Sequence, residues 1–298
     1  MTEFTGREKA LISRGYSEED VLRFSRVPEN EIRIAADRIF NELTENVCPS
    51  EHPVCYYVGA QPGCGKSTMI RQIKSGRLGE YYVDLAMDDY RSFHPLYDEL
   101  EELIERHWED REETTDDMPG SDIADFTQNF SGQAVDILEE MVTTGEERYS
   151  ILYEWAMRSS EEPLASMQRL KERGYEIMVN FIAVNKAVSL DACRTRAVIM
   201  NSKGRVFRAI PDFFHTLSVE RIPDSCNEIY AKGKDIITDF FITDRRGEIL
   251  WRSGDAGLPG ELLRDILDNG PTDIINIDHY SEAAYEHESR GFDTKETE

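Results

Sequence analysis

The first fifty residues of this 298-residue chain carry hydrophobic positions at helical spacing. Short amphipathic patterns cover residues 6–15 and 17–26, and a longer one covers residues 28–44 behind Pro28. In the longer pattern the apolar residues recur every three or four positions, namely at Ile32, Ala36, Ile39, Phe40 and Leu43. We therefore expect residues 1–50 to form a helical N-terminal segment.

From residue 54 onward the pattern changes to short apolar runs that alternate with helical stretches. The runs predict buried strands, over residues 54–58, 80–87, 149–154 and 176–184. Helical patterns lie between or after them, over residues 66–75, 96–107, 126–142, 161–173 and 189–200. Strands that alternate with helices of this length form βαβ units. The predicted fold is therefore α/β, with a doubly wound, mostly parallel sheet flanked by helices.

Three further segments complete the predicted organisation. The stretch DFFITDRRGEILWRS, residues 239–253, reads as two short strands around a turn and predicts an edge hairpin near the C-terminus. Eleven of the residues in 101–125 are acidic, which predicts a solvated and partly mobile insertion. We expect the main domain to span residues 51–270, with an acidic tail over residues 271–298.

Composition and charge narrow the class of protein. The formal net charge is −25 and no block of Lys and Arg is present, so the surface should repel nucleic acid. No apolar run reaches the roughly 20 residues of a membrane helix, and the start carries no secretory pattern. The five cysteines show no metal-binding spacing. These features predict a cytoplasmic protein with reduced thiols that binds neither nucleic acid nor membrane.

The sequence AQPGCGKST, residues 60–68, follows the first predicted strand and opens a helix. We call it the phosphate loop, because its strand, Gly-rich turn, Lys-Ser pair and helix match the P-loop pattern for ATP or GTP with Mg²⁺. The backbone of Gly63 to Gly65 would face the phosphates, Lys66 would reach the β and γ phosphates, and Ser67 would hold Mg²⁺, with Thr68 completing the loop. Ala60 replaces the usual first glycine, which is tolerated where φ is negative.

Cys64 lies inside the phosphate loop and allows two interpretations. It is either an unreactive small residue, or a thiol whose pKa is lowered by the positive helix end and which is open to oxidation.

Polar residues follow the second and third predicted strands at the sheet edge where ligands gather. Asp88 and Asp89 could accept a hydroxyl proton, hold Mg²⁺ through water, or cap the next segment. Glu154 and Arg158 could bind substrate hydroxyls and an anionic group, or form a surface salt bridge. The residues alone leave these alternatives open.

A group of arginines follows the fourth predicted strand, namely Arg194, Arg196, Arg205 and Arg208. Together with Gly204 they suit a lid that closes on a triphosphate and neutralises transferred charge. His215 comes shortly after and is either structural or directly involved.

In combination these motifs resemble the zeta-toxin kinases of bacterial toxin–antitoxin systems, over about residues 54–251. Matching patterns are AQPGCGKST, D-x-Y-R-x-x-H-P at 88–95, NFSGQAV at 129–135, E-x-x-x-R-S-S-x-x-P at 154–163, AVNKAVS at 183–189, Arg196 and R-A-x-P-x-x-x-H at 208–215. The resemblance implies transfer of the ATP γ-phosphate to the 3′-hydroxyl of UDP-N-acetylglucosamine, a nucleotide sugar. It also implies a partner antitoxin that blocks the ATP site.

The resemblance also implies roles for individual residues. Asp88 would be the base and Lys66 the phosphate lysine, while the triphosphate would be contacted by Arg196 and Arg208. The sugar-nucleotide side would be lined by Arg91, Glu154 and Arg158, with Gln133 at a further substrate-contact position.

Departures from the family pattern leave the acceptor open. Trp155 and Ala156 replace a usual Gly-Thr pair, which favours another nucleotide sugar, a nucleotide cofactor or a smaller metabolite as an alternative acceptor. Asp89 replaces a usual Ser or Thr and should raise the pKa of one carboxylate beside the base. A nucleotide-binding switch without an acceptor is a third hypothesis. The N-terminal helices either pack on the sheet or inhibit the ATP site in cis.

Overall fold

The computed structural model describes residues 3–66, 69–70, 82–109, 111, 119–202 and 210–272. Six strands form one sheet in the order β2-β3-β1-β4-β5-β6. Their bounds are β1 Val54–Gly59, β2 Tyr82–Leu85, β3 Ser150–Trp155, β4 Glu176–Ile182, β5 Asp239–Thr243 and β6 Ile249–Arg252. Neighbouring strands from β2 to β5 pair in parallel, and β5 pairs with β6 antiparallel. The predicted mostly parallel sheet and its edge hairpin are confirmed.

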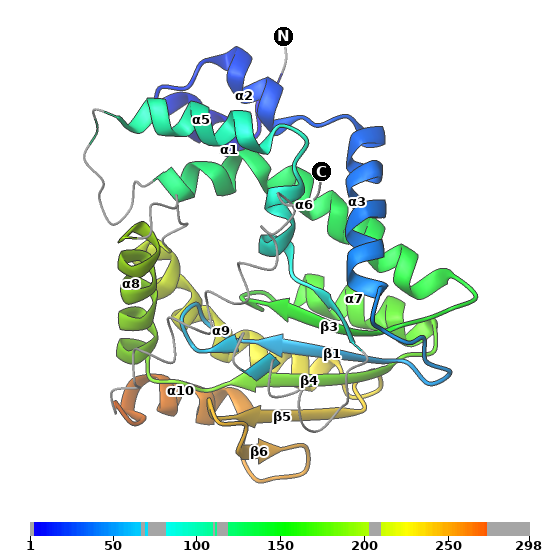
Figure 1. Ribbon diagram of the computed structural model, residues 1–298. Coiled ribbons are helices and arrows are strands. Elements are labelled where there is room, and N and C mark those ends of the chain that lie inside the picture. The colour runs from blue at the N-terminus through cyan, green and yellow to red at the C-terminus, as the bar shows by residue number, and fades with distance from the viewer. Residues whose placement is uncertain are drawn as a thin grey trace.

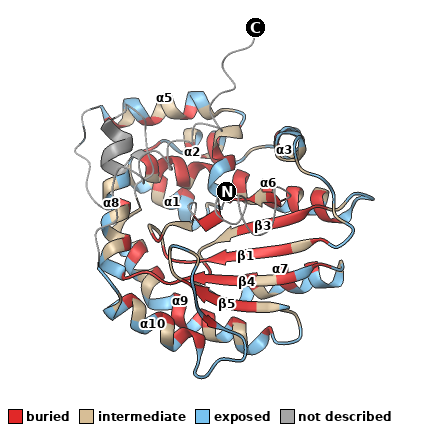
Figure 2. Ribbon diagram, turned by 60° about the horizontal axis from the view of Figure 1, so that its bottom comes forward, coloured by how far each residue is buried: buried red, intermediate tan, exposed pale blue. Residues whose placement is uncertain are grey.

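Helices cover both faces of this sheet. One face carries the larger core, to which α3 Glu29–Thr44, α6 Pro119–Thr144, α7 Glu161–Glu172, α9 Asp212–Lys232 and α10 Pro259–Asn269 contribute. The other face is covered by the helix that begins at Lys66 and by the start of α8 Lys186–Ser202. The parallel strands β1 to β5 are buried over most of their length, as strands between helix layers must be (Figure 2), whereas the antiparallel edge strand β6 is mostly exposed.

The first two helices, α1 Gly6–Ser13 and α2 Glu18–Ser25, lie with α5 Tyr97–Trp108 at the top of Figure 1, and α6 separates them from the sheet. A separate apolar cluster fills this unit, namely Leu11, Tyr16, Val21, Phe24, Leu100, Ile104, Trp108, Ile123 and Phe126. We call it the upper cluster. The N-terminal helices therefore pack mainly on α6, with α3 reaching β2. The alternative in which the N-terminal helices pack on the sheet does not hold for α1 and α2, which lie on α6.

The acidic stretch at residues 101–125 is not a solvated insertion in the parts that the structure describes. Most of it belongs to α5 and to the first turns of α6, and Ile104 and Trp108 are buried. Asp122 is fully buried, where its carboxylate accepts hydrogen bonds from the Tyr16 hydroxyl at 2.6 Å and from Trp108 Nε1 at 2.8 Å. The prediction considered only the number of acidic residues. In α5 these residues are spaced so that one face of the helix is left apolar and can be buried. Residues 110 and 112–118 lie outside the described part.

Two helices were missing from the sequence prediction. The first is α9, which begins at Asp212 and continues through Pro223. A proline inside a helix removes one backbone hydrogen bond and usually indicates that the segment is not helical. Here the burial of Ile222, Cys226 and Ile229 outweighs the destabilisation caused by Pro223. The second is α10, which packs on α9 and β5. The predicted tail from residue 273 onward lies outside the described residues.

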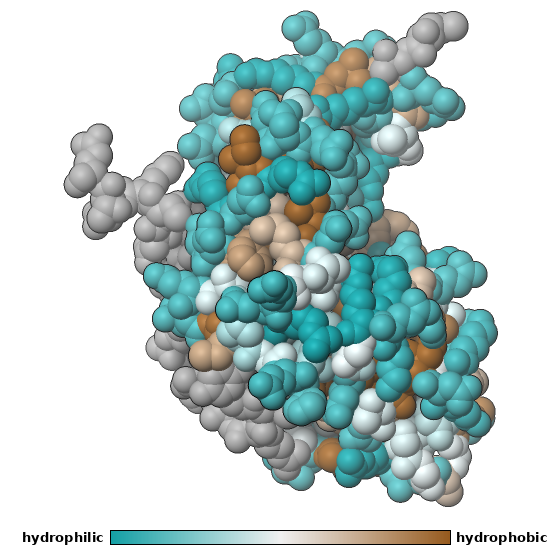
Figure 3. Space-filling view, turned by 90° about the vertical axis from the view of Figure 1, so that its right-hand side faces the viewer, coloured by the Kyte–Doolittle hydropathy of each residue, from teal (hydrophilic) through white to brown (hydrophobic). Residues whose placement is uncertain are grey.

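The face of the molecule that carries α3 is mainly polar. Figure 3 shows that hydrophilic side chains cover most of the face that carries α3, with scattered hydrophobic patches. In the described parts of the chain, no helix combines the length and the apolar character needed to cross a membrane.

Candidate functional site

The phosphate loop leaves the carboxyl end of β1 and turns at two glycines. Gly63 has φ +74° and Gly65 has φ +97°, values that favour glycine. A Cβ atom on Gly63 would also lie 2.0 Å from the backbone oxygen of Ser189 and 2.7 Å from Cys193 Sγ. Ala60 is buried and is not among the described residues with positive φ, so the tolerance expected for alanine there is confirmed.

Lys66 sits where this loop meets its helix. Its Nζ atom lies 3.7 Å from Glu154 Oε1 and donates a hydrogen bond to the Ala60 carbonyl at 3.5 Å. Burial alone would lower the pKa of Lys66, but nearby groups, including the carboxylates of Glu154 and Asp88, outweigh it and raise the pKa. The ammonium group is therefore charged and held by weak contacts that a phosphate can replace.

Cys64 is fully buried, and burial raises the pKa of its thiol despite the nearby Lys66. The hypothesis of a low-pKa, oxidisable thiol was wrong, because desolvation of the thiolate exceeds the effect of the positive charge. The unreactive interpretation agrees with the structure.

The residues after β2 form a short 3₁₀ helix, η2 Met87–Phe93, which carries Asp88 and Asp89. The Asp88 side chain is 62% exposed and its Oδ1 atom accepts hydrogen bonds from Arg91 Nη2 at 2.7 Å and Nε at 3.1 Å. The Tyr90 hydroxyl donates to the Asp84 carbonyl and fixes η2 to the end of β2. Asp88 is thus a solvent-accessible carboxylate on a braced segment.

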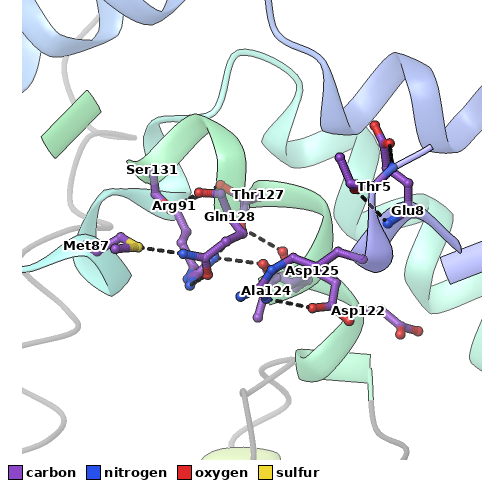
Figure 4. A network of polar contacts seen from close by, with 12 residues as sticks. Thr5, Glu8, Met87, Arg91, Asp122, Ala124, Asp125, Thr127, Gln128 and Ser131 are labelled. Atoms are coloured by element: carbon purple, nitrogen blue, oxygen red, sulfur yellow. Dashed lines mark hydrogen bonds and ion pairs between the residues drawn. The ribbon is translucent and has the colours of Figure 1, made fainter. Parts of the chain in front are cut away.

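Arg91 is buried beneath Asp88, where α6 surrounds its guanidinium (Figure 4). Nη1 donates to the Ala124 carbonyl and to Thr127 Oγ1, both at 2.9 Å, and Nη2 also donates to Gln128 Oε1 at 3.0 Å. Gln128 in turn lies 2.8 Å from Met87 Sδ through its Nε2 atom. These contacts bind Arg91 to α6 and to Asp88. A direct contact of Arg91 with substrate, as the family resemblance implies, would have to replace some of them.

Asp89 adds a carboxyl group next to Asp88. Solvent reaches this residue, yet protein atoms surround its carboxyl group densely. Desolvation raises the pKa of Asp89 well above its ordinary range, and the charges of Glu154, Asp88 and Asp84 add to the effect while Arg196 opposes it. The direction of this shift agrees with the predicted rise in the pKa of one carboxylate, and the charge of Asp88 contributes to it.

The end of β3 contributes Glu154 and Trp155 to opposite faces of the sheet. Glu154 is paired in register with Val58 and faces Lys66. The Trp155 ring packs beside Tyr153, with 5.7 Å between ring centroids, and is half-buried against the larger core. Arg158 places its guanidinium carbon 5.0 Å from the centre of the Phe214 ring on α9, a cation–π contact.

The structure describes some of the remaining predicted site residues and not others. Arg196 is exposed on α8, and its charge reaches Asp89. Arg194 forms an ion pair with Asp212 at the start of α9. Gln133 is half-buried on α6, about 140° around the helix from Gln128. Five predicted residues lie outside the described part, namely Ser67, Thr68, Gly204, Arg205 and Arg208.

Comparison with known proteins decides the family. The zeta toxin family model matches residues 37–255, which is most of the chain. The chain belongs to the zeta toxin family. Members of this family are kinases that act as the toxins of toxin–antitoxin systems.

Curated relatives and solved structures agree with this assignment. Toxin PezT of Streptococcus pneumoniae serotype 4 is 28% identical over 204 residues, covering 67% of this chain and 73% of the relative. Toxin zeta of Streptococcus agalactiae is 22% identical over 227 residues, covering 76% and 72%.

Two solved structures share the zeta toxin fold seen here. A chain from the PezAT chromosomal toxin–antitoxin system of Streptococcus pneumoniae matches with a TM-score of 0.67 and 22% identity, over 90% of this chain and 96% of that one. A chain of the AvrRxo1-ORF1:ORF2 complex with ATP matches with a TM-score of 0.52 and 13% identity, over 97% and 91%.

A row of buried, hydrogen-bonded polar side chains lies next to the phosphate loop, and the sequence did not predict that they contact one another. Gln61 is fully buried and its Nε2 atom donates to the Val184 carbonyl at 2.8 Å. Ser189 Oγ lies 3.4 Å from the same Nε2 atom and 2.8 Å from Nε2 of His215 on α9. Burial lowers the pKa of His215. These contacts favour the structural interpretation of His215, which ties α9 to the phosphate loop.

The residues present fit a nucleotide with Mg²⁺. Positive φ angles at Gly63 and Gly65, with Lys66 behind them, form the phosphate cradle. Mg²⁺ usually takes only one or two carboxylates and completes its shell with phosphate and water. Among the residues that the structure describes, no three His, Cys, Asp or Glu side chains form a metal-binding group. Asp88 and Glu154 are the carboxylates near Lys66.

Proposed function

We propose that this protein is an ATP-dependent kinase that transfers the γ-phosphate to a sugar hydroxyl of a nucleotide sugar, with the 3′-hydroxyl of UDP-N-acetylglucosamine as the first candidate acceptor. One observation carries the proposal. The phosphate-loop lysine, Lys66, lies beside Glu154 at 3.7 Å and within the electrostatic range of Asp88. A donor cradle and an accessible carboxylate therefore share one edge of the sheet.

In the proposed reaction Asp88 accepts the proton of the acceptor hydroxyl, whose oxygen attacks the γ-phosphorus. The bond from the γ-phosphorus to the β,γ-bridging oxygen breaks, and ADP leaves. Lys66 balances charge on the β and γ phosphates, and Arg196 and Arg208 would contact the triphosphate. Mg²⁺, which Ser67 would help to hold, supplies further charge neutralisation when bound. Glu154 and Arg158 bind and orient the acceptor.

The test uses purified protein, ATP, Mg²⁺ and UDP-N-acetylglucosamine, with products identified by mass. We expect ADP and a phosphorylated sugar nucleotide. Asp88→Asn should lower kcat by at least about a hundredfold, since it removes general-base catalysis. Lys66→Ala should do the same by removing a phosphate contact. Full activity of Asp88→Asn would rule out Asp88 as the base.

A different acceptor is the second candidate, and Trp155 favours it. Its half-buried ring at the end of β3 is far larger than the Gly that the family usually carries there. Incubation of the protein with a small-molecule extract and labelled ATP would identify the acceptor by the mass of the product. Slow ATP turnover that no metabolite changes would instead support a nucleotide-binding switch.

We further propose an antitoxin as protein partner. The support is family membership together with relatives whose structures are described as toxin–antitoxin and ORF1:ORF2 complexes. Co-purification of the tagged protein with the product of an adjacent small gene, and loss of ATP binding in the complex, is the expected result.

A further inference from the structure

The turn between β5 and β6 places an arginine behind the phosphate loop. Arg245 Nε donates to the Cys64 carbonyl at 3.0 Å, and Arg245 Nη2 donates to the Gly63 carbonyl at 3.2 Å. These residues are 181 and 182 positions apart in the sequence. One guanidinium thus holds two successive carbonyl groups of the loop from the edge hairpin.

The turn itself is fixed, so Arg245 is presented from a rigid base. The Asp244 carboxylate accepts hydrogen bonds from the backbone N–H groups of Arg246 at 2.8 Å and Glu248 at 2.9 Å. Gly247 N–H also donates to the Asp244 carbonyl at 3.2 Å. Such side-chain-to-backbone bonds hold a turn in one conformation.

The contact with Arg245 also determines the direction of the backbone N–H groups in the phosphate loop. In a trans peptide, the carbonyl of one residue and the N–H of the next point in opposite directions. Because Arg245 fixes the carbonyls of Gly63 and Cys64, the N–H groups of Cys64 and Gly65 point to the opposite side. Backbone N–H groups of a P-loop bind phosphate oxygens from that side.

We propose that Arg245 is a positioning residue of the phosphate loop: its fork fixes two carbonyls so that the following N–H groups face the nucleotide phosphates before any nucleotide binds. The proposal rests on the proposed nucleotide site and concerns donor binding alone. A lysine could not reproduce it, because one ammonium group lacks the planar fork that spans two carbonyls. Burial lowers the pKa of Arg245, yet an arginine stays charged in proteins.

The adjacent Arg246 offers a matched control. It is in the same turn and carries the same charge, but its side chain is exposed. Replacing either arginine by glutamine removes one positive charge near the loop, while only Arg245→Gln removes the contact with the carbonyls. Arg245→Lys separates charge from geometry, since it keeps the charge and can reach one carbonyl at most.

The experiment measures equilibrium binding of ATP, GTP and inorganic tripolyphosphate, without any acceptor. Arg245→Gln should weaken all three by about tenfold or more, as expected for loss of charged hydrogen bonds. Arg245→Lys should weaken them by a smaller factor that still exceeds the effect of Arg246→Lys. Arg246→Gln should change binding by less than about threefold, the effect of one exposed charge.

The outcomes separate this proposal from the proposed function. Equal effects of Arg245→Gln and Arg246→Gln would overturn it, since only long-range charge would then matter. Weaker binding of ATP with unchanged binding of tripolyphosphate would also overturn the proposal, because it would indicate that Arg245 affects the nucleoside part of ATP. If Arg245→Gln fails to fold, the comparison of ligand binding by Arg245→Lys and Arg246→Lys tests the proposal instead. A wild-type protein that binds none of the three ligands would contradict the proposed function itself.

Discussion

Among single residues, Arg91 has the role that the structure changes most. Family resemblance implies that it lines the substrate side, whereas its guanidinium contacts Asp88 and three groups of α6. It is buried, and the Asp88 side chain above it is largely exposed. The geometry favours an arginine that orients Asp88, the proposed base, and stabilises its negative charge, rather than one that binds substrate directly.

Arg91→Gln should therefore lower kcat by about ten- to a hundredfold with a smaller change in KM for the acceptor. Loss of the adjacent positive charge makes the carboxylate at position 88 harder to ionise, so the acid limb of the pH–rate profile should move to higher pH. Steady-state kinetics over a range of pH measures both effects. Arg264→Gln, which breaks an exposed ion pair with Asp224, is the control and should leave the profile unchanged. A raised KM with an unchanged profile would support direct substrate contact instead.

At the scale of elements, His94 joins η2, the segment that carries Asp88, to the N-terminal helices. It follows η2 directly, and its Nε2 atom lies 2.9 Å from the carbonyl oxygen of Phe24 in α2. Its Nδ1 atom accepts a hydrogen bond from the Leu96 N–H at 3.1 Å. The imidazole is therefore neutral, with Nε2 as donor, and burial lowers its pKa from 6.5 to about 4.

The lowered pKa predicts a specific pH dependence of stability. The unfolded chain binds a proton at His94 below pH 6.5 and the folded protein does so only near pH 4, so stability falls as pH falls through this window. From pH 7 to pH 5 the loss should be about 2 kcal/mol in the free energy of unfolding. Urea unfolding at the two pH values should show a smaller loss for His94→Gln. The exposed His52 provides the control, and His52→Gln should keep the wild-type dependence. Equal losses in all three proteins would contradict the prediction.

At the scale of the whole molecule, the N-terminal helices are part of the folded domain. They share the upper cluster with α5 and α6, and Arg14 forms an ion pair with the buried Asp122 at 3.0 Å. Within the part of the chain that the structure describes, α1 and α2 contact each other, α5, α6 and the segment after η2. This arrangement favours a structural role over inhibition of the ATP site in cis.

Weakening this packing should destabilise the protein without activating it. Leu11→Ala, at a fully buried position, should lower the free energy of unfolding by about 2–4 kcal/mol. Ile34→Ala, at a position 59% exposed, should change it by less than about 0.5 kcal/mol. Neither variant, nor deletion of residues 1–26, should raise ATP turnover. A gain of activity on deletion would support the cis-inhibitory hypothesis.

The sequence by itself determined the alternation of strands and helices, the edge hairpin and the glycines of the phosphate loop. These features depend on local period and on φ angles, which neighbouring residues encode. It failed at α9 and at the acidic stretch, because burial against distant elements overrode the local signals of Pro223 and of the acidic composition.

Only the tertiary structure decided which side chains meet. The clamp of Arg245 on Gly63, the pairing of Arg91 with α6, and the link from His94 to Phe24 all join residues far apart in the chain. The raised pKa of Cys64 likewise follows from burial, which no local motif specifies. A motif fixes the type of chemistry through its residue types, whereas packing of whole elements fixes the distances, the desolvation and the partners on which each residue's role depends.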